Sequence, residues 1–243
     1  MANPVVWFEL DGPAPEKAAA FYSELFGWHT QVLEGGYTTI DTHGGGGING
    51  GLGASQDGKP STRIYVLVDD LQKTLDRVAE LGGATVVPIT EMSVVTFAQF
   101  SDPQGNVIGL LPPPTDQEAA AGGVSKGDGA PVDWWEILGP DPKALWSFYR
   151  DLFGWEIVEA GTNQFLYGQI RQEDSGGGIG SSPDGQPHVN LYGRVDDLHK
   201  YLERAELLGG KTVMPPTDME HVGFAMLADP QGTTFGLWVL KQT

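Results

Sequence analysis

The chain has 243 residues, of which 40% are apolar, no cysteine and a formal net charge of −18. The lack of cysteine excludes disulfides, thiolate catalysis and zinc–thiolate sites. The acidic charge argues against nucleic acid and anionic membranes as partners, because both require basic patches. No apolar run approaches the roughly 18 residues of a membrane span and no signal peptide is visible, so a cytoplasmic protein is expected.

The first 112 residues follow one pattern twice: a strand, a helix and three strands. A strand is expected over residues 5–10, and a helix should begin at Pro13 or Pro15 and end before Gly27. Asp70 should cap a second helix with one apolar face, which ends at Gly82. The remaining strands are expected near residues 28–33, 37–41, 48–53, 63–68, 85–90, 94–101 and 107–111.

The same sequence then recurs 127 residues later. Phe21-Tyr22 becomes Phe148-Tyr149, and Leu25-Phe26-Gly27-Trp28 becomes Leu152-Phe153-Gly154-Trp155. Asp102-Pro103-Gln104-Gly105 likewise becomes Asp229-Pro230-Gln231-Gly232. A repeat of this length in constant register indicates two copies of one domain, with every loop expected to keep its length.

The two copies should be separate domains joined by a linker. Residues 113–131 are rich in Pro, Ala, Gly and acidic side chains and have no apolar period, which is typical of a linker. We therefore expect domains over residues 1–112 and 132–243. The expected fold class is α+β.

The order and spacing of these motifs resemble the vicinal oxygen chelate superfamily, which includes glyoxalase I, extradiol dioxygenases and bleomycin resistance proteins. Tandem members are labelled glyoxalase-like or hydroxylase. The resemblance implies paired βαβββ modules in each domain, with helices outside a curved mixed sheet that encloses a cavity. It also implies a metal held by two His and one Glu side chain.

The three metal-ligand positions that the resemblance assigns lack suitable side chains in both copies. They hold Trp7, Arg63 and Gly109 in the first copy, and Trp134, Asn190 and Gly236 in the second. Neither Trp nor Gly offers a metal-binding side chain, Arg keeps its proton, and a lone Asn is a poor ligand. We therefore predict no metal and no other cofactor.

Strand alternation predicts which other side chains share the inner face. Glu9 and Glu136 would follow Trp7 and Trp134 there, and aromatic surroundings would oppose the ionisation of a carboxyl group. Each Glu is a candidate general acid or base; alternatively, it bonds an Arg, a Tyr hydroxyl or backbone amides and fixes the sheet. The residues predicted to line the cavity and bind the ligand are Trp7, Arg63, Tyr65, Gly109, Trp134, Asn190, Tyr192, Arg194, Gly236 and Trp238. Where Gly replaces Glu, the cavity should be roomy.

These features predict a metal-free protein that binds one small aromatic or polycyclic molecule, with aromatic walls for contact and few polar groups for orientation. The net charge disfavours strongly anionic ligands unless a local Arg or Lys pocket exists. A metal-independent enzyme that uses Glu9 or Glu136 is the alternative, for isomerisation, cyclisation, hydration or hydroxylation-type chemistry. A metal-dependent glyoxalase or dioxygenase is a third. The chain could pair its two domains internally as a monomer, or form a homodimer.

Overall fold

The computed structural model describes residues 3–93, 95–114, 123–161, 165–173 and 175–241. The first copy forms β1(Val5–Asp11), α1(Pro15–Phe26), β2(His29–Val32), β3(Thr38–Asp41), β4(Asn49–Leu52), β5(Ser61–Leu67), α2(Leu71–Glu80), β6(Ala84–Glu91), β7(Thr96–Ser101) and β8(Val107–Leu111). The second copy forms β9(Val132–Gly139), α4(Pro142–Phe153), β10(Val158–Glu159), β11(Tyr167–Ile170), β12(Gly176–Ser181), β13(His188–Arg194), α5(Leu198–Leu207), β14(Lys211–Asp218), β15(Val222–Ala228) and β16(Thr234–Leu240). The expected succession of elements is confirmed.

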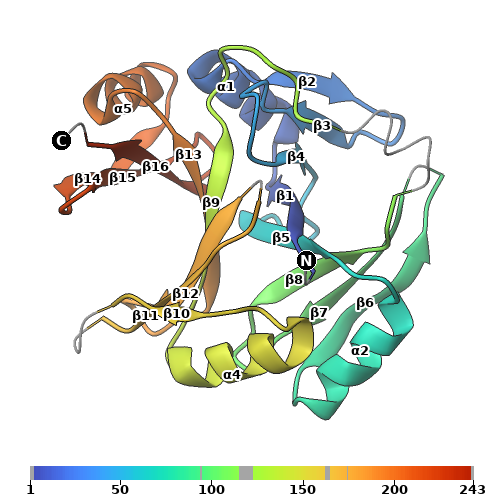
Figure 1. Cartoon of the computed structure of the whole chain (residues 1–243). Coiled ribbons are helices and arrows are strands. Elements are labelled where there is room, and N and C mark those ends of the chain that lie inside the picture. The colour runs from blue at the N-terminus through green and yellow to red at the C-terminus, as the bar shows by residue number, and fades with distance from the viewer. Residues whose placement is uncertain (1–2, 94, 115–122, 162–164, 174, 242–243) are drawn as a thin grey trace. The chain divides into compact units, whose positions relative to one another are not determined.

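Each copy contributes one open sheet of eight strands. The strand order is β2-β3-β4-β1-β5-β8-β7-β6 in the first sheet and β10-β11-β12-β9-β13-β16-β15-β14 in the second. β5 and β8 pair in parallel, as do β13 and β16, while the neighbouring hairpins are antiparallel, so both sheets are mixed. The predicted α+β class is therefore confirmed (Figure 1).

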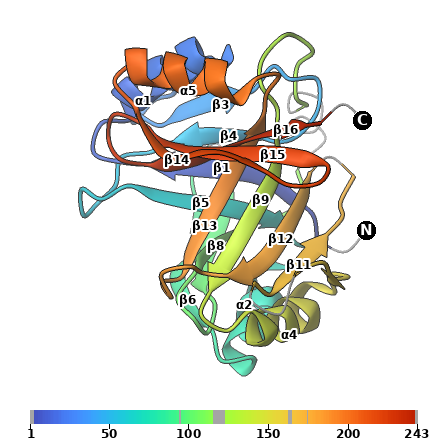
Figure 2. The same ribbon diagram turned by 90° about the vertical axis from the view of Figure 1, so that its left-hand side faces the viewer.

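Contacts divide the chain into two compact units that each draw on both copies. Unit 1 consists of Met1–Trp7, Arg63–Gly123 and Trp135–Val189, and unit 2 of Phe8–Thr62, Val124–Trp134 and Asn190–Thr243. Within unit 1 α2 packs against α4, and within unit 2 α1 packs against α5, which lie side by side at the top of Figures 1 and 2. The predicted domain boundaries follow the sequence repeat and stay a prediction.

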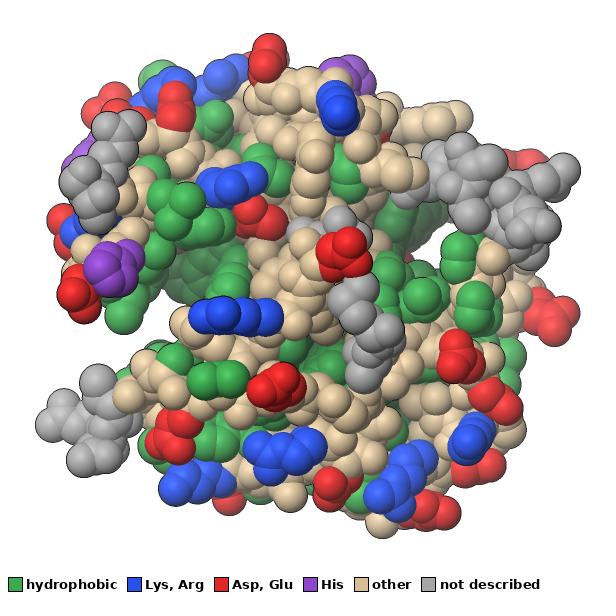
Figure 3. All heavy atoms as spheres, viewed as in Figure 1, with side chains coloured by type: hydrophobic (Ala, Val, Ile, Leu, Met, Phe, Trp, Pro, Cys, Tyr) green, Lys and Arg blue, Asp and Glu red, His purple; other side chains and the backbone are tan. Residues whose placement is uncertain are grey.

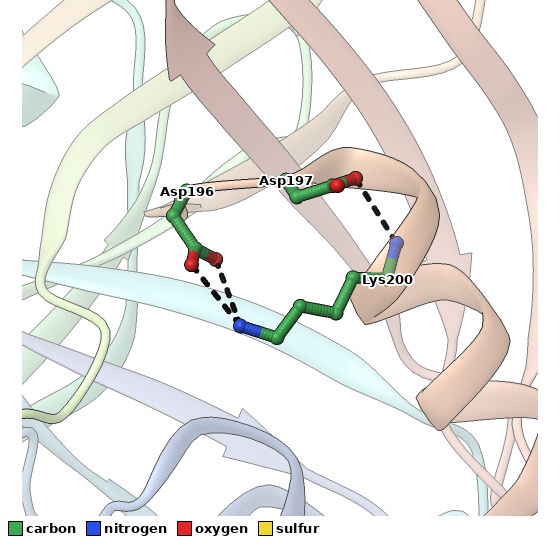
Figure 4. A network of polar contacts seen from close by, with 3 residues as sticks. All are labelled: Asp196, Asp197 and Lys200. Carbon is green, nitrogen blue, oxygen red and sulfur yellow. Dashed lines mark hydrogen bonds and ion pairs between the residues drawn. The ribbon is translucent and has the colours of Figure 1, made fainter.

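Helix ends follow local sequence rules. Asp197 accepts a hydrogen bond from the Lys200 amide at 3.1 Å and caps α5, while the Lys200 ammonium reaches Asp196 at 3.0 Å (Figure 4). Asp70 and Asp141 cap α2 and α4 in the same way, and each such cap stabilises its helix by about 1 kcal/mol. Ala14 at the start of α1 provides no side-chain cap.

The core of each unit is aromatic. In unit 2 Phe235 lies 5.3 Å from Phe26 and 5.7 Å from Trp28, centroid to centroid. In unit 1 Phe100 lies 6.2 Å from both Phe148 and Phe153. These contacts join rings from both copies, so the aromatic core of each unit is built from both copies of the repeat.

The motifs that define the repeat bind the other copy. In unit 1 the Tyr149 hydroxyl donates to Asp102 at 2.9 Å. In unit 2 Asp229 interacts with the buried Tyr22 hydroxyl, although that hydroxyl has no hydrogen-bond partner of regular geometry. Burial, and next the nearby carboxylate, raises the pKa of both tyrosines well above its usual value.

The Trp and Gln side chains of these motifs behave alike. The Trp28 indole donates to the Ala130 carbonyl at 2.7 Å, and the Trp155 indole donates to the Asn3 carbonyl at 2.9 Å. Because Ala130 is the 127-residue counterpart of Asn3, the two bonds are equivalent. Gln104 and Gln231 accept from the backbone amides of Asp141 and Ala14, at the starts of α4 and α1.

One expectation from the repeat is wrong. The loops do not all keep their lengths: Ile40 pairs with Gly50 and Ile170 with Gly177, so β3 and β11 differ by 130 residues whereas β4 and β12 differ by 127. The second half of the predicted linker is bound by backbone hydrogen bonds, since Gly45 donates to Ser125. The linker's first half, residues 115–122, lies outside the described residues.

Acidic and basic side chains are scattered over the face that Figure 3 shows, as expected from their spread along the sequence. Within the described residues, no helix is long and apolar enough to cross a membrane. The cytoplasmic location stays a prediction.

Candidate functional site

The positions that the resemblance assigns to metal-binding Glu are covered by tyrosine rings. Gly109 on β8 pairs with Tyr65 on β5, and a Cβ atom added to Gly109 would lie 2.1 Å from Cδ1 of Tyr65. Gly236 on β16 pairs with Tyr192 on β13, and its added Cβ would also lie 2.1 Å from the tyrosine Cδ1. The expectation of room at these glycines is therefore wrong, because the neighbouring ring fills the space that Glu would need.

The first of these rings reaches a third strand. Gln99 on β7 pairs with Gly109, and its side-chain amide donates to the Tyr65 hydroxyl at 2.9 Å in a buried setting. The Tyr65 ring thus lies over Gly109 on β8, and its hydroxyl group is hydrogen-bonded to β7, the next strand. In the second copy the residue that pairs with Gly236 is Met226, whose side chain has no amide group. Tyr65 and Tyr192 are only 3% and 7% exposed.

The residues at these positions do not fit a metal of the family's type. Tryptophan, arginine, asparagine and glycine supply no set of His and carboxylate donors. Among the described residues there is no group of three or more His, Cys, Asp or Glu side chains that could hold a metal ion. We therefore derive no chemical step through a metal.

Both predicted acid/base residues are bound by tyrosine hydroxyls. In unit 2 Tyr37 donates to Glu9 Oε1 at 3.2 Å, and in unit 1 Tyr167 donates to Glu136 Oε1 at 2.8 Å. All four side chains are partly exposed. Of the alternatives left open by the sequence, bonding of each Glu to a Tyr hydroxyl is observed, which orients the carboxylate without removing it from solvent.

Glycines make these Glu–Tyr pairs possible. A Cβ atom at Gly51 would lie 2.0 Å from the Tyr37 hydroxyl oxygen, and one at Gly178 would lie 2.1 Å from that of Tyr167. Gly178 is the 127-residue counterpart of Gly51, but Tyr167 is 130 residues after Tyr37. The tyrosines were missed from the sequence because the constant offset places Gln164 opposite Tyr37. The shared Gly-rich strand that follows each Tyr was the available signal.

A cluster of three residues occurs in the second copy alone. Asp133 Oδ1 accepts from the Trp238 indole at 2.8 Å, and its Oδ2 lies 3.1 Å from Arg194 Nε. The Arg194 guanidinium carbon lies 5.9 Å from the centre of the Trp238 ring. Burial raises the pKa of Asp133, while the Trp238 hydrogen bond and the Arg194 charge oppose that rise.

The corresponding first-copy residues are Val6, Leu67 and Leu111, none of which is polar. Arg194 and Trp238 were predicted as ligand-binding residues and the structure brings them together. Asp133 was missed, although its replacement of a valine next to a predicted site position was a usable signal.

The other predicted site residues lie on the strands where they were expected. Trp7 on β1, Arg63 on β5 and Trp134 on β9 are partly exposed, and Asn190 on β13 is 4% exposed.

A pocket of about 310 Å³ in unit 1 is lined by none of the predicted residues; its walls are Pro103, Gln104, Pro140, Asp141, Ala144 and Leu145. This hollow marks the contact between the 102–105 turn and the start of α4 rather than the candidate site.

The chain belongs to the glyoxalase-like domain family, whose sequence profile matches residues 7–111 and 136–238, one match in each copy. "Putative glyoxylase CFP32" of Mycobacterium tuberculosis is 28% identical over 255 residues, covering 95% of this chain and 92% of that protein. "Anthracycline biosynthesis protein DauV" of Streptomyces sp. strain C5 is 27% identical over 259 residues, covering 97% and 93%.

Solved structures show the same fold. The Mn(II)-bound glyoxalase from Novosphingobium aromaticivorans superposes with a TM-score of 0.73 at 13% identity, covering 99% of this chain and 83% of that one. The 2,2',3-trihydroxybiphenyl 1,2-dioxygenase from Sphingomonas wittichii gives a TM-score of 0.68 at 17% identity, covering 98% and 91%. The predicted membership of the vicinal oxygen chelate superfamily is confirmed.

Proposed function

We propose that the protein binds a flat aromatic or polycyclic small molecule without using a metal. The observation that carries this proposal is the pair of tyrosine rings over Gly109 and Gly236, because they fill the space of the family's metal-binding carboxylate in both copies. Partly exposed Trp7, Trp134 and Trp238 offer aromatic contact area, and the Glu–Tyr pairs offer oriented polar groups.

The relatives support a polycyclic ligand. Two of them, DauV and DnrV of Streptomyces, are named anthracycline biosynthesis proteins and are 27% and 26% identical to this chain. An anthracycline is a fused polycycle that contains aromatic rings, and the side chains alone predict a ligand of this class. The partners expected are thus small molecules rather than nucleic acid or membranes.

Isothermal titration with an anthracycline aglycone, before and after treatment of the full chain with a chelator, tests the proposal. We expect saturable binding that the chelator leaves unchanged. Metal analysis of the same sample should give far less than one ion per chain. Loss of binding after chelation, restored by one divalent metal, would contradict the proposal.

A metal-independent enzyme is the second candidate, and the Glu–Tyr pairs favour it. Each carboxylate has a phenol within 3.2 Å, so it has a fixed orientation and a neighbouring proton donor. Such a carboxylate could remove a proton from a bound aromatic ligand.

The matched variants Glu9→Gln, Glu136→Gln, Tyr37→Phe and Tyr167→Phe separate catalysis from binding. If one Glu acts as a base, its Gln variant should lose turnover of the bound ligand by about a hundredfold while the ligand affinity changes little. The Phe variant of its partner should lose less. Turnover at the wild-type rate in all four variants would exclude this role for both carboxylates.

A further inference from the structure

We propose that the second sheet carries a subsite for a carboxylate group of the ligand, formed by Arg194 with Asp133 and Trp238. This inference rests on the proposed binding function and names a chemical feature of the ligand. The corresponding positions of the first copy hold the apolar side chains Val6, Leu67 and Leu111.

The contacts of Arg194 leave the outer edge of its guanidinium group available. Its Nε lies 3.1 Å from Asp133 Oδ2, and its backbone amide donates to the Pro131 carbonyl at 2.9 Å. The two terminal nitrogens have no partner within the part of the chain that the structure describes, and the side chain is 45% exposed. A guanidinium edge with two parallel N–H groups matches the geometry of a carboxylate.

Asp133 and Trp238 hold this edge in place. The Asp133 side chain is 15% exposed and binds both the arginine Nε and the Trp238 indole, so the three side chains restrict one another. An arginine that is already oriented loses less conformational entropy when a ligand binds. The Trp238 ring adds an aromatic surface beside the guanidinium at 5.9 Å.

The subsite lies on the face that also carries the tyrosine-covered glycine. Arg194 pairs with Trp238, and Tyr192 pairs with Gly236 two residues earlier on the same two strands. Residues two apart on a strand share a face. A ligand whose ring system lies along this face of the second sheet can therefore direct an anionic substituent to Arg194.

The charge around the subsite disfavours multiply charged anions. Arg194 shares its charge with Asp133, and the whole chain carries −18, so a multiply charged group such as phosphate would be disfavoured. The chemical class expected is an aromatic or polycyclic monocarboxylate. Arg194 is the local arginine that an acidic protein needs in order to accept such a ligand.

The test compares anthraquinone-2-carboxylate with anthraquinone-2-carboxamide by isothermal titration of the full chain. The carboxylate should bind wild-type protein about tenfold more tightly than the amide, as a charge-assisted hydrogen-bonded pair allows. Arg194→Leu, which introduces the first-copy residue, should abolish this preference while the affinity for the amide stays the same. Arg204→Leu removes the same charge from exposed α5 in unit 2 and should retain the preference.

Removing Arg194 leaves Asp133 without its ion pair, so the double variant Asp133→Val with Arg194→Leu restores the apolar first-copy pair and tests the same loss without an unpaired charge. A preference that survives in both Arg194 variants, or equal binding of the two probes to wild type, would overturn the subsite and leave the proposed function standing. Failure of both probes to bind wild type would count against the proposed function for this ligand class and remove the subsite with it.

Discussion

The two copies share a scaffold but differ in the polar side chains around it. Each covers a glycine with a tyrosine ring, and each bonds a strand Glu to a hairpin Tyr. The first copy adds Gln99 to its tyrosine, whereas the second adds the Asp133–Arg194–Trp238 cluster. The shared features belong to the common scaffold, and the differences are where we expect the two copies to differ in the ligands that they bind.

The largest expected effect comes from restoring the family's Glu at the glycines. Gly109→Glu and Gly236→Glu should each lower the free energy of unfolding by about 3 kcal/mol, because the added side chain displaces a buried tyrosine ring. Urea unfolding measures this. The double variants Gly109→Glu with Tyr65→Ala and Gly236→Glu with Tyr192→Ala should each lose less unfolding free energy than the sum of their two single changes. Wild-type stability in either single variant would show that the rings do not fill these positions.

A second comparison concerns the tyrosines that join the copies. Tyr149→Phe should cost about 2 kcal/mol, because it removes a buried hydrogen bond to the Asp102 carboxylate. Tyr22→Phe should cost clearly less, because the Tyr22 hydroxyl has no regular hydrogen bond to lose. Thermal unfolding of the two variants in parallel measures the difference. Equal losses would mean that the two copies are joined in the same way within unit 1 and within unit 2.

The third prediction exchanges the residue beyond the tyrosine. Gln99→Met copies the second-copy residue and removes the amide that donates to the Tyr65 hydroxyl, so we expect a loss of about 1 kcal/mol. Met226→Gln in the second copy is the matched control and should not give an equal gain, since the amide must also be desolvated. Urea unfolding of both variants checks this, and a neutral Gln99→Met would show that the buried bond contributes little.

The smallest effect is a pH dependence that arises from two buried carboxyl groups of unit 2. Burial raises the pKa of Asp133 and of Asp229 above the ordinary 3.8. Such a carboxyl holds its proton more tightly in the folded chain, so stability should fall as pH rises from about 4 through the raised pKa. Asp133→Asn should weaken this fall, whereas Asp128→Asn, an exposed change in the same unit, should not. Unfolding at pH 4 to 7 measures it, and a steeper fall in Asp133→Asn would contradict the assignment.

The sequence predicted most of the fold because its signals are local or repeated. Asp-Pro helix starts, Gly helix ends and alternating apolar strands placed nearly every element, as at α4 and β5. The candidate site was predicted only in part. Glu9, Glu136, Arg194 and Trp238 were identified from strand alternation. Tyr37 and Tyr167 were not, because a three-residue shift in the hairpin hides their equivalence.

By itself, the sequence determined that there are two copies, which family they resemble, and that the metal-ligand positions hold no suitable side chains. Only the tertiary structure decided what occupies those positions and which copy each motif binds. The sequence predicted open space at Gly109, whereas the Tyr65 ring occupies that space in the structure. Tyr149 bonds Asp102 of the other copy rather than Asp229 of its own. The physical reason is that a strand pattern fixes which face a side chain takes, whereas its partner depends on segments brought together only by folding.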